Sequence, residues 1–213
     1  SMPDPGAVLA NRLEAVLTSR GIKVEHGAVS SAGASPVALL RYESPKLAEV
    51  GRSLMVRSDN LMAEATLRAI APSLPLDSAI VREAKLWRTK GVDPGYWRIN
   101  DGSGLSRFNA ISAATLGAVL RAMALDSSLA AAYIDSFARV GLDGTLTSFL
   151  AKHPRKGEFV LKSGSMGGVQ CYAGYRLDPN TRAATHVIVV MVNNLVGSRA
   201  EFRRAVEQLL LSI

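Results

Sequence analysis

Apolar residues recur at helical spacing along most of the chain, and this pattern predicts a largely helical protein. In the first such segment Leu9, Leu13, Val16 and Leu17 fall on one helical face, and Gly21 suits the C-terminal end of the helix. The predicted helices cover residues 4–21, 44–56, 61–70, 76–91, 112–124, 127–139, 144–152 and 199–211.

Two of these helices begin at a residue typical of an N-terminal cap. Ser44 followed by Pro45 predicts a cap and the first helical residue, and Ser112 predicts the cap of a later helix. Between them, the helical spacing predicts three inward-facing residues in one helix: Leu61, Ala65 and Ile70.

After Lys156 the pattern changes from helical spacing to alternation or continuous β-type runs. Three such runs, at 158–165, 170–178 and 184–194, are separated by short turns and predict an antiparallel meander. Two shorter strands are predicted earlier, at 22–29 and 37–43, with a loop between them. Helices followed by a meander and a final helix indicate an α+β fold in which helices cover an antiparallel sheet.

Composition and charge narrow the class of protein. The chain has 213 residues, of which 48% are hydrophobic, enough to bury a core in one large domain or two small ones. Its longest apolar run, 186–192, has the length of a strand, so no membrane span is predicted. The net charge is +7, but the basic groups at 152–156 and 199–204 lack interleaved aromatic residues. We therefore expect no nucleic-acid partner, and at most weak attraction to an anionic polymer such as a cell-wall glycan.

Neither metal nor cofactor is predicted. Cys171 is the single cysteine, which excludes an internal disulfide and a cysteine-based zinc site, and its apolar surroundings predict a buried structural thiol. The three histidines, His26, His153 and His186, lack acidic or cysteine partners at ligand spacing. The sequence also has no glycine loop of the kind that cradles phosphate.

Three polar segments are candidates for chemistry: 58–60 (Ser-Asp-Asn), 101–107 (Asp-Gly-Ser-Gly-Leu-Ser-Arg) and 162–165 (Lys-Ser-Gly-Ser). Each has a structural interpretation when taken alone. Ser58 or Asp59 could cap the next helix with Glu64 as a capping partner, the glycine-rich segment could be a turn, and the lysine could be exposed before a bend.

The order of these segments is more specific than any one of them. Ser-Asp-Asn at a helix junction, followed about 100 residues later by Lys-Ser-Gly at the start of a meander, gives two of the three motifs of penicillin-recognising serine enzymes. With the segments at 101–107 and 141–146, the chain from Pro5 onward resembles the D-alanyl-D-alanine carboxypeptidase/endopeptidase family of class C low-molecular-mass penicillin-binding proteins. The resemblance implies the penicillin-binding/β-lactamase-like transpeptidase fold.

The resemblance also implies roles for individual residues. Ser58 would relay a proton, Asn60 would bind a substrate carbonyl, and Asp59 would point away and hold the junction. Lys162 would supply a positive charge. Ser163 and Ser165 would donate hydrogen bonds to the substrate carboxylate. Gly164 would let the substrate pair with its strand, and Arg107 and Leu105 are candidates for a second anion contact and the cleft wall.

One expected motif is absent. No serine in the chain has a lysine three residues later, so the S-x-x-K motif that would carry the nucleophile is missing; Ser19 and Ser148 have lysines four residues on. Ser1-Met2 is typical of an expression scar. We therefore expect residues 1–213 to form the C-terminal portion of the catalytic domain, lacking the first strands, the S-x-x-K helix and the inserted domains, and to be inactive alone.

By resemblance, the parent protein would hydrolyse peptidoglycan stem peptides ending in D-Ala-D-Ala through an acyl-serine and would bind β-lactams. It would act in the periplasm or outside the cell, and the chain's partner would be the missing N-terminal part. The motifs leave carboxypeptidase and endopeptidase preference open. The alternative is a non-catalytic module of the same fold that binds cell-wall peptides or a protein; its unpaired sheet edge counts against it.

Overall fold

The computed structural model describes residues 4–25 and 40–213, in two units: 1–43 and 44–213. The first unit contains helix α1 (Pro5–Ser19), and the carboxylate of Asp4 caps it by accepting the Ala7 N–H at 2.9 Å. The predicted strands at 22–29 and 37–43 are wrong in their described parts, which are irregular. A two-stranded pair is marginal in isolation, and no described strand lies beside them in this unit. Residues 26–39, including His26 and parts of both predicted strands, lie outside the described part.

The second unit is built on a four-stranded antiparallel sheet in the order β3-β4-β5-β6. The strands are β3 (Ala138–Arg139), β4 (Phe159–Met166), β5 (Val169–Leu177) and β6 (Ala184–Val192). The last three confirm the predicted meander. Gly174 on β5 lets the backbones approach, since a Cβ there would lie 2.1 Å from the Val160 oxygen.

Alternating side chains of the sheet enter two separate cores. On one face, Leu161 and Tyr172 pack with Val206 and Leu210 of α7 (Arg199–Leu211). On the other, Val160 and Tyr175 pack with α5 (Ala113–Leu125) and α6 (Ala130–Ser136). The predicted cap of α5 is confirmed, since Ser112 accepts the Thr115 N–H. The helix α7 also begins with a cap, because Ser198 forms a capping box with Glu201. The sheet is therefore covered on both faces, as the α+β prediction requires.

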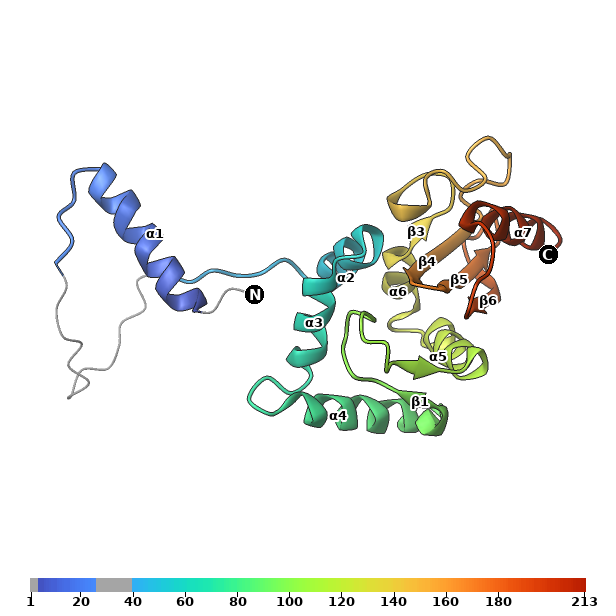
Figure 1. The fold of residues 1–213 in the computed structure, drawn as a ribbon, viewed down its shortest axis with the longest axis horizontal. Helices are drawn as coiled ribbons and strands as arrows, with labels where there is room; N and C mark the ends of the chain where they lie inside the picture. Colours follow the sequence, from blue (N-terminus) through green and yellow to red (C-terminus); the bar gives the residue numbers. More distant parts are fainter. Residues whose placement is uncertain (1–3, 26–39) are drawn as a thin grey trace. The chain divides into compact units, whose positions relative to one another are not determined.

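A smaller helical layer lies below the sheet in Figure 1. It contains α3 (Asn60–Ala69) and α4 (Leu76–Thr89), followed by the short elements η1 (Pro94–Tyr96), β1 (Trp97–Arg98) and β2 (Ala110–Ile111). Leu67, Ala71 and Ala79 form its buried cluster. The helix α2 (Leu47–Arg57) packs on α6 and links this layer to the sheet.

Several predicted details are wrong. α2 starts at Leu47 with Lys46 as its cap residue, so Ser44 and Pro45 lie outside the helix. In α3 the buried residue is Leu67, whereas Leu61 is 80% exposed. Ala65 and Ile70 are exposed too, because the junction before Asn60 turns a different face of the helix inward.

The segments predicted as helices at 127–139 and 144–152 form less helix than expected. The first is reduced to α6 because Ala138 and Arg139 pair with β4. The second contains only the single turn η2 (Gly144–Leu146). In both places, tertiary contacts override local helix preference.

Strand β4 has one free edge along the part that carries the Lys-Ser-Gly motif. β3 pairs only with Val160 and Leu161, and no other described strand lies on that side of β4. The backbone from Lys162 to Met166 therefore presents hydrogen-bonding groups on that edge. Among the described residues, no helix has the length and apolarity needed to cross a bilayer.

Candidate active site

The three polar segments singled out in the sequence meet at one cavity of about 510 Å³. α2 and α3 contribute the Ser-Asp-Asn junction, β4 contributes Lys-Ser-Gly-Ser, and the segment 101–107 contributes a rim. The lining residues are Ser58, Asn60, Ser103, Gly104, Leu105, Thr145, Leu146, Phe149, Lys162, Ser163, Gly164, Ser165, Gln170, Tyr172 and Arg203.

The Ser-Asp-Asn triplet is the corner between two helices. Ser58 ends α2 in the left-handed backbone region, with φ 56° and ψ 50°. Asp59 caps α3, because its carboxylate accepts the Met62 N–H at 3.0 Å. Ser58 and Asn60 line the cavity while Asp59 is occupied at the helix start. The triplet is therefore both a helix cap and part of the cavity wall.

Lys162 connects the strand motif to this corner. Its Nζ donates to Ser58 Oγ at 2.7 Å and to the Ser163 carbonyl oxygen at 2.6 Å. Burial lowers the pKa of Lys162 below its ordinary value of 10.5. A hydroxyl has one proton and two lone pairs, so Ser58 can accept from the lysine and still donate its own proton into the cavity.

Ser163 and Ser165 are two residues apart on β4, so strand alternation places their side chains on the same face. Ser163 Oγ lies 2.8 Å from Thr145 Oγ1, and Ser165 lines the cavity further along the strand. At Gly164 an added Cβ would meet only Cys171 Cβ, at 3.9 Å. The neighbouring strands therefore leave room for a side chain at this position. Cys171 itself is half-buried, and burial raises the pKa of its thiol.

The segment 101–107, here called the glycine-rich loop, is held by two carboxylates. Asp101 accepts the N–H groups of Gly104 and Ser106, both at 2.6 Å, and Asn109 Nδ2 at 2.8 Å. Burial of Asp101 opposes its ionisation, but these hydrogen bonds outweigh it and lower the pKa of its carboxyl. The loop thus holds its shape through an ionised side chain of its own.

The second carboxylate is that of Glu64, one helical turn after Asn60. It accepts the N–H groups of Gly102 at 3.1 Å and Ser103 at 3.0 Å. The prediction that Glu64 is a capping partner at the helix start is wrong, since its carboxylate instead ties α3 to the glycine-rich loop. Gly102 also lies directly on α3, where an added Cβ would be 2.6 Å from the Ala63 oxygen.

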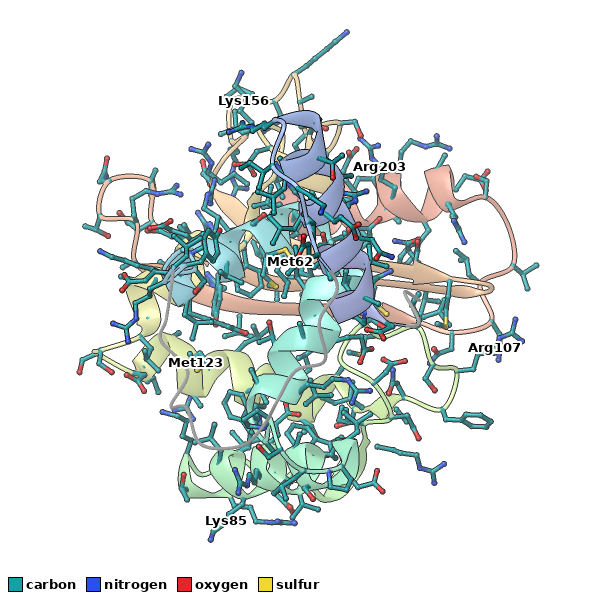
Figure 2. The ribbon with its side chains drawn as sticks, turned by 90° about the vertical axis from the view of Figure 1, so that its left-hand side faces the viewer. Met62, Lys85, Arg107, Met123, Lys156 and Arg203 are labelled. Atoms are coloured by element: carbon teal, nitrogen blue, oxygen red, sulfur yellow. The ribbon has the colours of Figure 1, made fainter. Side chains whose placement is uncertain are left out.

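The two outer residues of this loop differ in position. Leu105 lines the cavity with 61% of its surface exposed. Arg107 is exposed and is absent from the described residues that line the cavity; its side chain points outward in Figure 2. The structure therefore brings Leu105, but not Arg107, to the cavity wall.

A second loop, 141–146, also borders the cavity through Thr145 and Leu146 and is here called the Asp-Gly-Thr loop. Asp143 accepts the backbone N–H of Arg139 at 2.6 Å and bonds the side chains of Arg139 and Arg52 at 3.0 and 3.2 Å. Burial opposes ionisation of Asp143, but the hydrogen bonds and positive charges of Arg139, with the charge of Arg52, lower its pKa.

Gly144 seats this loop on α2. Its φ is +59°, and an added Cβ would lie 2.7 Å from the Val56 oxygen and 2.9 Å from Ala138 Cβ. Thr145 follows and faces the cavity, and Leu146 is buried in the core. The sequence had contributed this loop only to the family resemblance, without a role for any of its residues.

Other lining residues carried no signal in the sequence. Arg203 on α7 donates to Glu207 and to the side chain and backbone oxygen of Ser148, and its guanidinium stacks over Phe149 with 4.7 Å to the ring centroid. Arg203 lies in the N-terminal half of α7 and is labelled in Figure 2. These residues are far apart in the sequence, so only the fold shows that they meet.

The described residues contain no group of three or more His, Cys, Asp or Glu side chains that could hold a metal ion. The polar groups of the cavity are instead hydroxyls, amides, the Lys162 ammonium and the Arg203 guanidinium. Such a set can bind a carboxylate, move a proton between hydroxyl and amine, and stabilise a developing oxyanion.

Comparison with known proteins finds carboxypeptidases that are similar in sequence. A D-alanyl-D-alanine carboxypeptidase from Actinomadura sp. (strain R39) is 28% identical over 204 residues, which are 88% of this chain and 37% of that protein. Carboxypeptidase DacB from Mycolicibacterium smegmatis is 30% identical over 160 residues, 71% of this chain and 35% of that protein. The chain spans about a third of the length of these curated relatives.

Solved structures show the same fold. Penicillin binding protein 4 (dacB) from Haemophilus influenzae, complexed with a β-lactam, matches with a TM-score of 0.76 and 22% identity. The match covers 99% of this chain and 51% of that chain. The predicted penicillin-binding fold and the family resemblance are confirmed. Residues 1–210 match the family model for D-Ala-D-Ala carboxypeptidase 3 (S13), and the chain belongs to this family.

Proposed function

We propose that this chain is the C-terminal part of the catalytic domain of a serine-type D-Ala-D-Ala carboxypeptidase/endopeptidase. Its substrates would be peptidoglycan stem peptides ending in D-Ala-D-Ala, its inhibitors β-lactams, and its place of action the periplasm or the cell exterior. One observation carries the proposal: Lys162 Nζ lies 2.7 Å from Ser58 Oγ in a cavity that also holds Asn60 and the hydroxyls of Ser163 and Ser165.

The proposed reaction begins with attack of a serine hydroxyl on the carbonyl of the bond between the two D-alanines. As the tetrahedral intermediate collapses, the leaving amine takes a proton and the acyl group stays on the serine as an ester; water then hydrolyses this ester. Ser58 would pass the proton to the amine, because its oxygen already accepts from Lys162 and its hydrogen is free to be donated.

The remaining residues would position the substrate. Asn60 would donate its amide to a substrate carbonyl. The free edge of β4 from Lys162 onward would pair with the peptide as an added strand, with one N–H after Gly164 stabilising the oxyanion. Ser163 and Ser165 would donate to the terminal carboxylate. Leu105 would form a wall of the cleft, and Arg107, exposed on its loop, could meet only a part of a substrate that extends beyond the cavity.

The nucleophile would come from another segment. No serine in this chain belongs to an S-x-x-K motif, so we propose that an N-terminal part supplies both the serine and its lysine base. This chain alone would then form no acyl-enzyme. Below, "complete enzyme" means this chain together with that part.

A labelling experiment tests the assignment. The complete enzyme should form a covalent adduct with a fluorescent penicillin that survives denaturation, whereas the isolated chain should form none. An adduct on the isolated chain would contradict its predicted inactivity. Lys162→Ala in the complete enzyme should slow acylation by about 100-fold or more, since it removes a charged hydrogen bond and its charge. Unchanged acylation would contradict the role of Lys162.

The missing S-x-x-K motif also favours a second candidate, a non-catalytic module that binds cell-wall peptides or a protein partner. One observation would distinguish the enzyme from the binding module. An in-frame S-x-x-K upstream of Pro3 in the gene would exclude the binding module, and its absence would favour that module over the enzyme.

A further inference from the structure

Recognition of the substrate carboxylate needs donors that are free to reach it, and the described lining of the cavity offers few. Two cationic side chains line the cavity, Lys162 and Arg203. Lys162 Nζ already donates to Ser58 Oγ and the Ser163 carbonyl. Arg203 already bonds Glu207 and both oxygens of Ser148. Two of the three Lys162 N–H groups and three of the five Arg203 N–H groups are therefore already used within the protein, and the hydroxyl groups of the cavity are needed as further donors to a carboxylate.

The hydroxyl of Ser163 is paired with that of Thr145, at 2.8 Å. Each hydroxyl has a single proton, so one of the two must be the donor and the other the acceptor. If Ser163 donated to Thr145, its proton would be used in a hydrogen bond within the protein and could not be donated to a carboxylate. If Thr145 donates to Ser163, the Ser163 proton is directed outward into the cavity. A carboxylate accepts and cannot donate, so its arrival selects the second arrangement.

Resting on the proposed function, we infer that Thr145 is a positioning residue for recognition of the terminal carboxylate. Its hydroxyl donates to Ser163 Oγ, and Ser163 in turn donates to the carboxylate. Chains of hydrogen bonds polarise one another, so the second bond is stronger than it would be from an isolated serine. The pair favours a peptide with a free C-terminal carboxylate over one that ends in an amide, because the carboxylate accepts a charge-assisted hydrogen bond, whereas the amide oxygen is uncharged and its N–H₂ group cannot accept.

The loop that carries Thr145 is fixed on both sides. Gly144 lies against the Val56 oxygen of α2, and Leu146 is 2% exposed in the core. Asp143 holds the loop through Arg52 of α2 and Arg139 of β3. Thr145 therefore has little freedom to move away from Ser163. The helix α2, on which Gly144 rests, ends at Ser58. The Asp-Gly-Thr loop therefore contacts the helix that carries Ser58 of the Ser-Asp-Asn motif, and its Thr145 contacts Ser163 of the Lys-Ser-Gly motif.

The test measures KM and kcat of the complete enzyme for N-acyl peptides ending in D-Ala-D-Ala and for the same peptides with a C-terminal amide. Thr145→Val removes the hydroxyl with little change of shape, and Thr145→Ser retains it. Thr147→Val is the matched control, since Thr147 is exposed on the same turn and its hydroxyl bonds only the Gly144 oxygen, at 3.4 Å.

We expect Thr145→Val to raise KM for the carboxylate peptide by about 5-fold to 10-fold, the value of one neutral hydrogen bond, because the bond from Ser163 to the carboxylate itself remains. For the carboxylate peptide kcat should change by less than about 3-fold, and for the amide peptide both KM and kcat should change by less than about 3-fold. The preference of the enzyme for the free carboxylate therefore falls. Thr145→Ser should restore wild-type KM. All variants should keep the melting temperature of Thr147→Val.

The outcomes separate this inference from the proposed function. A wild-type complete enzyme that neither cleaves these peptides nor is acylated by penicillin overturns the proposed function and this inference with it. A wild-type enzyme that is active, with Thr145→Val equal to Thr147→Val, overturns the role of Thr145 alone. Equal loss on the carboxylate and amide peptides would show a general structural effect and would also overturn it.

Discussion

The two loops that border the cavity are anchored in different ways. Both place a glycine against a carbonyl oxygen of a flanking helix: Gly102 on Ala63 of α3, and Gly144 on Val56 of α2. The glycine-rich loop is then held mainly by carboxylates accepting backbone N–H groups, from Glu64 and Asp101. The Asp-Gly-Thr loop is held by packing, by a left-handed backbone and by charge pairs.

This difference has a physical consequence for the cavity. Leu105 at the tip of the glycine-rich loop is 61% exposed, whereas Leu146 next to Thr145 is 2% exposed. A loop held by hydrogen bonds at the surface can open locally without unfolding the core, but a loop packed into the core cannot. We expect the first loop to adapt to different ligands and the second to fix the position of the reacting groups.

The largest effect is expected at Gly144. Gly144→Ala combines a positive φ with contacts below 3 Å to Val56 and Ala138, and should cost about 2–5 kcal/mol of stability. Gly104→Ala is the matched control in the other loop: its φ is +79°, but an added Cβ meets nothing within 4 Å, so it should cost about 1 kcal/mol. Urea denaturation measures both. Equal costs would mean that the Asp-Gly-Thr loop is no more tightly packed than its counterpart.

A smaller effect is expected at Glu64. Glu64→Ala leaves the Gly102 and Ser103 N–H groups without their acceptor and should cost about 1–3 kcal/mol, concentrated in the glycine-rich loop. Hydrogen exchange of those two amides should become about 10-fold to 100-fold faster, with the Thr145 amide unchanged. The exposed Glu49 on α2 provides a control substitution. Uniform acceleration in both loops would contradict their separate anchoring.

The lowered pKa values of Asp101 and Asp143 predict how the stability of each loop changes at low pH. Asp101 and Asp143 both have a folded-state pKa below the ordinary 3.8, so their ionised forms stabilise the native state. This stabilisation is complete above the ordinary pKa and is lost as the pH falls through the lower folded-state values. Asp143→Asn should cost about 1–2 kcal/mol at neutral pH, and its difference from wild type should shrink between about pH 5 and pH 2.

The measurement is denaturant unfolding of wild type, Asp143→Asn and Asp101→Asn across that range. Amide exchange at pH 3 should show the glycine-rich loop loosening first, because packing still holds its counterpart. A difference that stays constant with pH would contradict ionised carboxylates as the stabilising groups.

The smallest effect is expected at Arg52. Its side chain is 44% exposed, pairs with Asp143 at 3.2 Å and donates to the Asp135 carbonyl oxygen, so Arg52→Met should cost about 1 kcal/mol. Gly144 would keep the loop on α2 without this pair. Thermal unfolding at low and high salt measures the effect. A loss well above that of Asp143→Asn would show that charge, and not packing, holds the Asp-Gly-Thr loop.

The sequence predicted the elements whose pattern is local. The meander 158–194 and the helix at 199–211 follow from alternation and helical spacing, and Ser112 follows from capping chemistry. The segments whose predicted structure is wrong depend on contacts with residues far away in the sequence. Residues 138 and 139 leave the predicted helix because β4 needs a partner, and Leu61 is exposed because the junction at Ser58 rotates α3.

The candidate site was predictable to the extent that it uses motifs. Ser58, Asn60 and the Lys162–Ser165 strand were placed in one site from their order, and they do line one cavity. Glu64 and Thr145 were not assigned their contacts, because each acts on a residue at least 18 positions away. Spacing within a motif gives no information on such pairs; only the packing of α2 and α3 against the two loops does.

The backbone of Ser58 carries a cost that has nothing to do with the cavity. A left-handed residue at a helix C-terminus is the position where glycine is most favourable, and a side chain there costs about 1–2 kcal/mol. Glycine would stabilise the corner, yet it would remove the hydroxyl that Lys162 binds. The chain thus gives up thermodynamic stability at the point where its two motifs meet. A search for more stable variants would select glycine at this position, and would lose the proposed proton relay with it.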